Sequence, residues 1–308
     1  MGLISRKGTI IMSKMFEEVT RIRTDWAKGD AERDAGLTVP EGLVRHLDIP
    51  YGEDPMQKLD VYYPEGTAKA LPTIISIHGG GWVYGSKELY SHYCMDLAMR
   101  GFTVVNFNYR LAPEHKYPAC IEDCVNVLHW VSKNAKDHFI DLNNIFTVGD
   151  SAGGQLNFQL LTLVSNPRFA ALFPFKAPEG FKVRACGLNC GCYFIPLSKF
   201  VTPQRMGALF EALMPEDYMT YVPQLKAHKY LTKDFPAAFV MTFQHDYLKM
   251  MAAPAHRKLK RAGAESILRI YGDRKDNQFG HVFHLRIRHP LAKEVNDAQC
   301  AFFREHMV

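Results

Sequence analysis

The chain has 308 residues and a formal net charge of +5 at pH 7, from 37 basic and 32 acidic side chains. Its hydrophobic content of 47% and charged content of 22% are those of an ordinary globular protein and exclude a disordered chain. The length suits a single large α/β domain with an insertion, over residues 1–308. The densest basic run, residues 257–261, indicates the solvated face of a helix, so we expect neither a nucleic acid nor a membrane as partner.

The amino-terminal residues and the cysteines indicate in which cellular compartment the protein is expected. The only apolar stretch near the start is residues 9–12, which is shorter than a secretion signal or a membrane span requires, and Met12 is an alternative first residue. The seven cysteines include no CxxC pair, so we expect buried free thiols and no zinc site. Free thiols without a secretion signal predict a cytoplasmic protein.

Taken in chain order, short apolar runs alternate with longer amphipathic stretches, a pattern typical of an α/β fold with a mostly parallel sheet flanked by helices. The predicted strands are short and rich in β-branched residues: 43–49, 58–63, 73–77, 103–107, 145–148, 183–188, 238–242 and 267–270. The predicted helices are residues 89–99, 119–134, 152–165, 250–262 and 291–306.

Two stretches do not fit this alternation, residues 1 to about 40 and about 196 to 234. Open α/β sheets bind ligands at the carboxyl ends of their strands. We therefore expect these two stretches to form a helical lid over that edge; the alternative is that they are ordinary peripheral helices.

The strongest chemical signal is the sequence GDSAG at residues 149–153, which follows a predicted strand and precedes a predicted helix. This is the context of a nucleophile elbow, with Ser151 as the nucleophile. The turn is so tight that a side chain at either glycine would clash. The serine oxygen then lies at a helix amino terminus, where the free N–H groups favour developing negative charge.

A glycine-rich loop, HGGGW at residues 78–82, directly follows the predicted strand 73–77. Glycines leave the backbone N–H groups uncovered, so a ligand can approach them closely. We expect the N–H groups of Gly80 and Gly81, together with that of Ala152, to form an oxyanion hole. His78 is expected to brace this loop rather than to act as a base.

A nucleophilic serine needs a base and an acid that orients the base, in the chain order Ser, Asp or Glu, His. Asp246 is the predicted acid because it follows the late strand 238–242. Asp273 and Asp276 lie too near the histidine loop, and Asp234 precedes its strand.

His281 is the predicted base because it opens the loop between the last strand and the final helix. His284 on the same segment, His289 before a proline and His245 beside the acid are weaker alternatives. Asp150 directly precedes the serine, and we expect it to tie down neighbouring backbone.

Three motifs together, HGGGW at 78–82, YRLAPEH at 109–115 and GDSAGG at 149–154, resemble the hormone-sensitive-lipase-like family of bacterial esterases. The resemblance extends from about residue 74 to the end of the chain. It implies an α/β-hydrolase fold with a lid, and no cofactor or metal. It also implies a triad of Ser151, Asp246 and His281, with oxyanion donors at Gly80, Gly81 and Ala152.

Two positions depart from the family pattern. Members usually have Pro-Leu after the acid, whereas this chain has Tyr247 and Leu248. The histidine is commonly followed by Gly-Phe, whereas Val282 takes the place of that glycine here.

The sequence therefore predicts a carboxylic ester hydrolase that acts on small-molecule esters through an acyl-enzyme. Large side chains in the second stretch, Phe200, Phe210 and Tyr218, suggest a short-acyl pocket. The alternatives are an amidase or formamidase with the same triad, and a non-catalytic small-molecule receptor on this fold. The family often uses the final strand and C-terminal helix as a dimer edge, so a homodimer is also considered.

Overall fold

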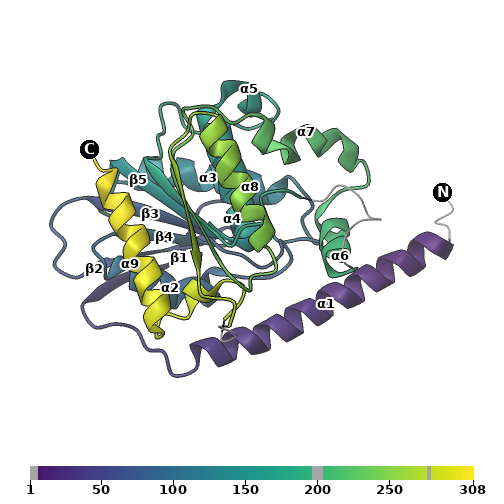
Figure 1. Ribbon diagram of the computed structural model, residues 1–308, viewed down its shortest axis with the longest axis horizontal. Coiled ribbons are helices and arrows are strands. Elements are labelled where there is room, and N and C mark those ends of the chain that lie inside the picture. Colours follow the sequence, from purple (N-terminus) through teal and green to yellow (C-terminus); the bar gives the residue numbers. More distant parts are fainter. Residues whose placement is uncertain (1–5, 196–203, 276–278) are drawn as a thin grey trace.

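The computed structural model describes residues 6–195, 204–275 and 279–308. Among these residues, eight strands form one sheet in the order β1-β2-β4-β3-β5-β6-β7-β8 (Figure 1). β2 pairs antiparallel with both of its neighbours, and the strands from β4 to β8 are parallel. The predicted mostly parallel sheet of an α/β fold is therefore confirmed.

Each predicted strand corresponds to an observed one, with ends that differ by a few residues. The observed bounds are β1 Leu43–Pro50, β2 Lys58–Pro64, β3 Leu71–Ile77, β4 Thr103–Phe107, β5 Ile140–Asp150, β6 Ala185–Asn189, β7 Ala237–Phe243 and β8 Ser266–Tyr271. The largest difference is at the start of β5, because Ile140 and Asp141 pair with β3 before the apolar run begins.

Helices cover both faces of this sheet. On one face lie α2 (Lys87–Ala98) and α9 (Pro290–Glu305), and on the other lie α3 (Ala119–Asn134), α4 (Ser151–Ser165) and α8 (Lys249–Arg261) (Figure 1). Between β6 and β7 come shorter helices, α6 (Gln204–Leu213), η1 (Tyr218–Tyr221), α7 (Val222–Leu225) and η2 (Ala227–Lys229). The remaining short helices are α5 (Pro167–Ala170) and η3 (Phe283–Leu285).

Side chains alternate between the two cores along the central strands. In β3, Ile75 and Ile77 belong to the core under α3, α4 and α8, whereas Ile74 belongs to the core under α2 and α9. Successive strand residues point to opposite faces, so a strand buried on both faces must be apolar throughout. This explains why the central strands appear in the sequence as continuous apolar runs.

The register of the parallel strands aligns their carboxyl ends. Ile77 of β3 pairs with Gly149 of β5, and Asp150 pairs with Asn189 of β6. The loop after β3, the β5–α4 turn and the loop after β6 therefore start at the same edge of the sheet. The loops after β7 and β8 follow at this edge, because those strands are parallel to β6.

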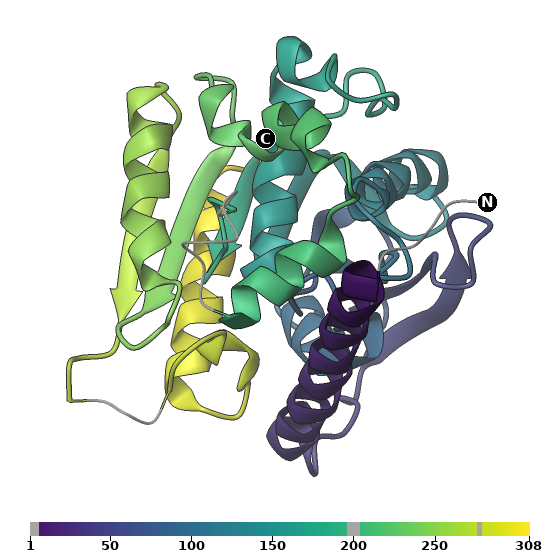
Figure 2. The ribbon, with the colours of Figure 1, turned by 90° about the vertical axis from the view of Figure 1, so that its right-hand side faces the viewer.

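Helix α1 (Arg6–Asp34) lies outside the sheet and packs beside α6 (Figures 1 and 2). Met15, Val19 and Ile22 of α1 are buried in the core. The two stretches that break the strand–helix alternation thus contribute helices that touch each other. Their role as a lid stays a prediction, and residues 1–5 and 196–203 lie outside the described part of the chain.

The remaining expectations concern cysteines, charge and membrane spans. All seven cysteines are buried and free, as predicted. The basic run 257–261 falls at the end of α8, where Arg257, Lys260 and Arg261 are exposed. None of the described helices is long and apolar enough to cross a membrane.

Candidate active site

The elbow forms where β5 ends at Asp150 and α4 begins at Ser151. Ser151 has a φ of +53°, a left-handed conformation that costs a non-glycine residue about 1–3 kcal/mol. A Cβ on Gly153 would lie 2.1 Å from the Ile77 carbonyl oxygen, and one on Gly149 would lie 2.5 Å from the Gly153 carbonyl oxygen. Both glycines are therefore required by the close approach of backbone, as the sequence indicated.

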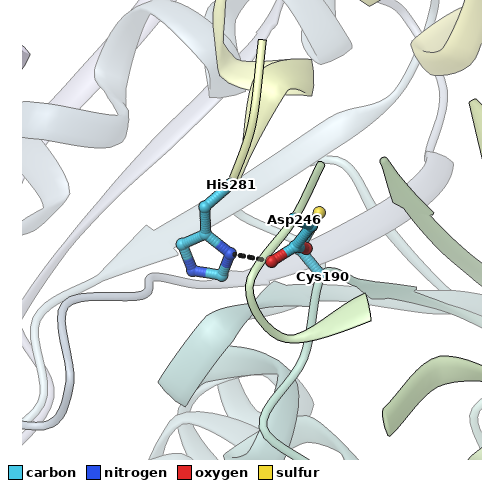
Figure 3. A group of neighbouring side chains, drawn as sticks. All are labelled: Cys190, Asp246 and His281. Atoms are coloured by element: carbon cyan, nitrogen blue, oxygen red, sulfur yellow. Dashed lines mark hydrogen bonds and ion pairs between the residues drawn. The ribbon is translucent and has the colours of Figure 1, made fainter. Parts of the chain in front are cut away.

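Asp246 and His281 form a hydrogen-bonded pair at the same edge. The Nδ1 atom of His281 lies 2.9 Å from Oδ1 of Asp246 (Figure 3). Asp246 is 5% exposed, and it also accepts hydrogen bonds from the Thr242 hydroxyl at 3.0 Å and the Leu248 N–H at 2.8 Å. Burial alone would raise the pKa of Asp246, but the hydrogen bond and charge of His281 and the Leu248 N–H outweigh it. The pKa therefore lies below its ordinary value, and the carboxylate is ionised.

The second nitrogen of His281 is available. Its Nε2 atom is buried and has no hydrogen-bond partner among the described residues. Because Asp246 takes Nδ1, a neutral His281 carries its proton on Nδ1 and presents the Nε2 lone pair. This is the protonation state that a general base requires.

Cys190 lies behind this pair, in the loop after β6 (Figure 3). Its thiol hydrogen-bonds with Asp246 and with the backbone of Val282, and burial raises its pKa well above the ordinary value. Cys190, Asp246 and His281 are the one group in the described residues whose ligand atoms lie close enough together, within 4.8 Å, to hold a metal ion. Hydrogen bonds between these side chains already account for the grouping.

The two departures from the family pattern both lie at this site. Val282 has a φ of +52°, a left-handed conformation that a glycine would adopt without strain and a β-branched residue rarely adopts. Tyr247 is 58% exposed, and its ring centroid lies 4.3 Å from that of His281. Its hydroxyl also hydrogen-bonds with Ser151, so Tyr247 contacts two of the three predicted catalytic side chains, Ser151 and His281.

The glycine loop is held against the elbow by a buried tyrosine. The Gly79 N–H donates to the Tyr90 hydroxyl at 2.9 Å, and that hydroxyl donates to Oδ2 of Asp150 at 2.8 Å. A Cβ on Gly80 would lie 2.0 Å from the Tyr84 carbonyl oxygen, and its φ is +114°. Only glycine therefore fits at this position.

The backbone donors expected for the oxyanion hole carry no other hydrogen bond. In the described part of the chain, the N–H groups of Gly80, Gly81 and Ala152 have no acceptor, in contrast to that of Gly79. His78 is fully buried, stacks on Tyr109 at 4.1 Å, and lies 2.7 Å through Nδ1 from the Gly79 carbonyl oxygen. Burial lowers the pKa of His78 to about 4, so it braces the loop as a neutral ring.

Asp150 has a different environment from Asp246. Burial raises its pKa to about 7, although the hydrogen bond from Tyr90 acts in the opposite direction. The ring of His284 is fully buried, and its Nε2 atom lies 4.0 Å from Oδ1 of Asp150. Burial lowers the pKa of His284 to about 3, so this ring is neutral and lies outside the pocket. Asp150 thus ties the elbow to the glycine loop, as the sequence suggested.

A pocket of about 770 Å³ opens onto these groups. Ser151, His281 and Gly80 line it from the sheet side, and α1 and α6 line it from the other. Met206, Leu209, Met250 and Met251 are among its apolar lining residues. Phe210 and Tyr218 do not line it; they pack on each other at 5.4 Å between ring centroids. Phe200 lies outside the described residues.

The weaker candidates for acid and base are placed elsewhere. His245, Asp234 and Asp273 are exposed and do not line the pocket, and Asp276 lies outside the described residues. His289 caps α9 by accepting the Leu291 N–H at 3.1 Å.

Sequence reasoning missed Tyr90 and gave no role to Tyr247. Tyr90 lies on the predicted helix 89–99, and nothing in that pattern marks it as a partner of a residue 60 positions away. Tyr247 could have been found, because it replaces the family's proline beside the acid.

Comparisons with known proteins show the family to which the chain belongs. The family profile described as alpha/beta hydrolase fold matches residues 74–285, which is more than half of the chain. The chain therefore belongs to the α/β-hydrolase fold family.

Its relatives and structural neighbours include esterases. Esterase LipC and carboxylesterase NlhH of Mycobacterium tuberculosis are 33% and 35% identical over 133 and 144 residues, or 42% and 46% of this chain. This chain spans only 33% and 43% of the length of those two proteins. The crystal structure of inhibited esterase B from Lactobacillus rhamnosis superposes with a TM-score of 0.86 at 26% identity, and it covers 95% of this chain and 96% of that chain. The resemblance to hormone-sensitive-lipase-like esterases is thereby confirmed.

Proposed function

We propose that this protein is a serine carboxylesterase, with Ser151 as nucleophile, His281 as general base and Asp246 as the acid that orients it. The observation that carries the proposal is the unpaired Nε2 atom of His281 in the pocket that Ser151 also lines, with Nδ1 held by Asp246. Such a constellation activates a hydroxyl for attack on a carbonyl carbon.

In the proposed mechanism, His281 removes the proton from Ser151 as the serine oxygen bonds to the ester carbonyl carbon. The N–H groups of Gly80, Gly81 and Ala152 receive the oxyanion. His281 then gives its proton to the leaving alcohol, and the acyl-enzyme is hydrolysed by water that the same histidine activates.

We propose short-acyl esters as the substrates, with α1 and α6 as the lid of the site. Support comes from the cover over the glycine loop: a Cβ on Gly81 would lie 3.0 Å from Leu209 of α6 and 3.2 Å from Trp26 of α1. The two helices thus close directly over the expected oxyanion donors. The large side chains of Phe210 and Tyr218, from which the sequence suggested a short-acyl pocket, do not line the pocket.

The test is hydrolysis of p-nitrophenyl acetate, butyrate and octanoate by the wild type and by Ser151→Ala. We expect kcat to fall about 10⁶-fold in the variant, as in other triad serine enzymes. Circular dichroism establishes that the variant is folded. Equal activity in both proteins would disprove the nucleophile, and a maximum on octanoate would disprove the short-acyl preference.

An amidase uses the same triad, so the ester must be compared with its matched amide. We expect kcat/KM for p-nitrophenyl acetate to exceed that for p-nitroacetanilide by far more than the ratio of their hydroxide-catalysed rates. An ester-to-amide ratio of kcat/KM close to the ratio of the two hydroxide-catalysed rates would favour an amidase.

A further inference from the structure

A second, smaller hollow lies beside the active-site pocket. Its volume is about 250 Å³, and Arg33, Arg286, Arg288 and His289 line it together with three apolar side chains. Arg33 and Arg286 also line the larger pocket, so the two hollows meet at these side chains. None of the described residues that line the smaller hollow is acidic.

Arg33 is paired with two carboxylates, so these three side chains together carry one negative charge. Its side chain is 8% exposed, and its guanidinium donates to Asp30 at 2.7 Å and to Asp34 at 2.5 Å. A further N–H donates to the Leu89 carbonyl oxygen at 2.8 Å. Arg33 therefore forms a fixed wall between the two hollows.

Arg286 and Arg288 form no ion pair with any carboxylate in the part of the chain that the structure describes. The side chain of Arg286 is exposed, and it makes no hydrogen bond or ion pair with the residues that the structure describes. Arg288 donates to the carbonyl oxygens of Ala35 at 2.8 Å and Arg33 at 3.1 Å, and no described carboxylate pairs with it. Arg33, Arg286 and Arg288 together with Asp30 and Asp34 therefore carry a net charge of +1 beside the pocket.

Among the described residues, the acidic ones that line the larger pocket are Asp25, Asp30 and Asp150, and Asp150 accepts the Tyr90 hydroxyl at 2.8 Å. Asp30 is committed to Arg33 and accepts the Tyr84 hydroxyl at 2.8 Å. Asp25 lies eight residues before Arg33 on α1, and at 1.5 Å per residue this is about 12 Å along the helix. Asp25 therefore lies toward one end of the pocket, and Arg33 and Arg286 lie toward the other.

The arginine end is the end of the leaving alcohol. In the proposed mechanism His281 must protonate the leaving oxygen, so the alcohol lies on the side of the His281 loop. Arg286 follows His281 by five residues on this loop, after η3. A group carried by the alcohol therefore extends toward Arg286.

We propose that the smaller hollow binds a negatively charged oxygen group, a carboxylate or a phosphate, on the alcohol portion of the ester. This inference rests on the proposed esterase function and names its substrate class. Guanidinium groups bind both anions through paired N–H donors, which gives the site its geometry. The preferred substrates are then short-acyl esters of acidic alcohols.

The test compares two acetate esters of nearly equal size. One is the acetate of para-hydroxyphenylpropanoate, which is anionic, and the other is the acetate of the matching propanamide, which is neutral. The measured quantity is the ratio of their kcat/KM values, followed through phenol release. We expect Arg286→Gln to lower this ratio about fivefold, and Arg286→Lys to retain most of it. The acetate of para-hydroxyphenyl phosphate is measured in parallel, and the anion with the larger Arg286→Gln effect identifies the group.

The control is Arg168→Gln, an exposed arginine on α5, which lies at the opposite end of the molecule from α1 (Figures 1 and 2). Its ratio is expected to equal that of the wild type. Hydrolysis of both esters with the same ratio in Arg286→Gln and wild type would overturn this inference alone. A fall in the ratio of anionic to neutral kcat/KM in Arg168→Gln as large as that in Arg286→Gln would also overturn it. Failure of the wild type to hydrolyse either ester or p-nitrophenyl acetate would overturn the proposed function, and the inference with it.

Discussion

The pocket has two walls that differ in packing. The sheet wall is formed by the elbow and the glycine loop, with Ser151 and Gly80, and the α1 wall is formed by α1 residues such as Trp26 and Gly29. On the sheet wall, a Cβ on Gly153 would lie 2.1 Å from a backbone oxygen of β3. On the α1 wall, Gly29 also lines the pocket, yet a Cβ there would meet nothing within 4 Å. The sheet wall is fixed by backbone packing, whereas the α1 wall has room to change.

The α1 wall is attached mainly by side chains. Arg23 donates to the carbonyl oxygens of Val83 at 2.8 Å and Ala112 at 3.0 Å, and it pairs with Glu114 at 2.7 Å. Side-chain contacts of this kind tolerate substitution better than interlocked backbone. We infer that the sheet wall determines the chemistry and that the α1 wall tunes the choice of ester.

The largest expected effect falls on the sheet wall. Asp246→Asn should lower kcat/KM for p-nitrophenyl acetate about 10⁴-fold, because an amide at this position no longer orients the imidazole or stabilises its cation. The control is Asp234→Asn, which changes an exposed carboxylate outside the pocket and should leave kcat/KM within about twofold. Similar losses in both variants would remove the distinction between the two aspartates.

Asp150→Asn should change how stability depends on pH. Burial raises the pKa of Asp150 to about 7, whereas the unfolded chain releases this proton near 3.8. Between these values the native state binds more protons than the unfolded state, so this group's contribution to stability falls as pH rises from about 4 to about 7. The asparagine variant lacks this loss. Its free energy of unfolding relative to that of the wild type should therefore rise by up to about 4 kcal/mol between about pH 4 and about pH 7.

The measurement is urea unfolding of both proteins at about pH 4.5 and about pH 8. His284 has a lowered pKa and opposes this trend, but it is present in both proteins, so most of its own contribution cancels in the difference between them. A stability difference that does not change with pH would show that Asp150 is ionised in the native state.

Gly153→Ala should destabilise the fold by about 3 kcal/mol, because backbone of β3 or of the elbow must move to admit the methyl group. The midpoint of urea unfolding measures this effect. A loss below about 1 kcal/mol would show that the sheet wall is less rigid than its packing indicates.

Gly29→Ala should have the smallest effect and the opposite sign. Alanine in place of glycine within a helix stabilises it by up to about 1 kcal/mol, and no atom obstructs the methyl group here. The melting temperature should therefore rise slightly. A clear fall would indicate that α1 is packed as tightly as the sheet wall.

Much of the sheet wall could be predicted from the sequence because its signals are local. The strand, turn and helix around Ser151 follow one another within a few residues, and so do the strand and glycines around Gly80. Backbone sterics at a tight turn act over this short distance, so residue types alone indicate the geometry. Chain order then placed Asp246 and His281, because parallel strands end at one edge.

Only the tertiary structure decided the remaining contacts. Tyr90 meets Asp150 across 60 residues, and Arg286 lines the same pocket as Arg33 although the two lie at opposite ends of the chain. The side chains of α1 carry no local signal for the glycine loop they cover. Contacts between segments so far apart depend on how helices and loops pack around the sheet, and that packing is a property of the whole chain rather than of any one stretch.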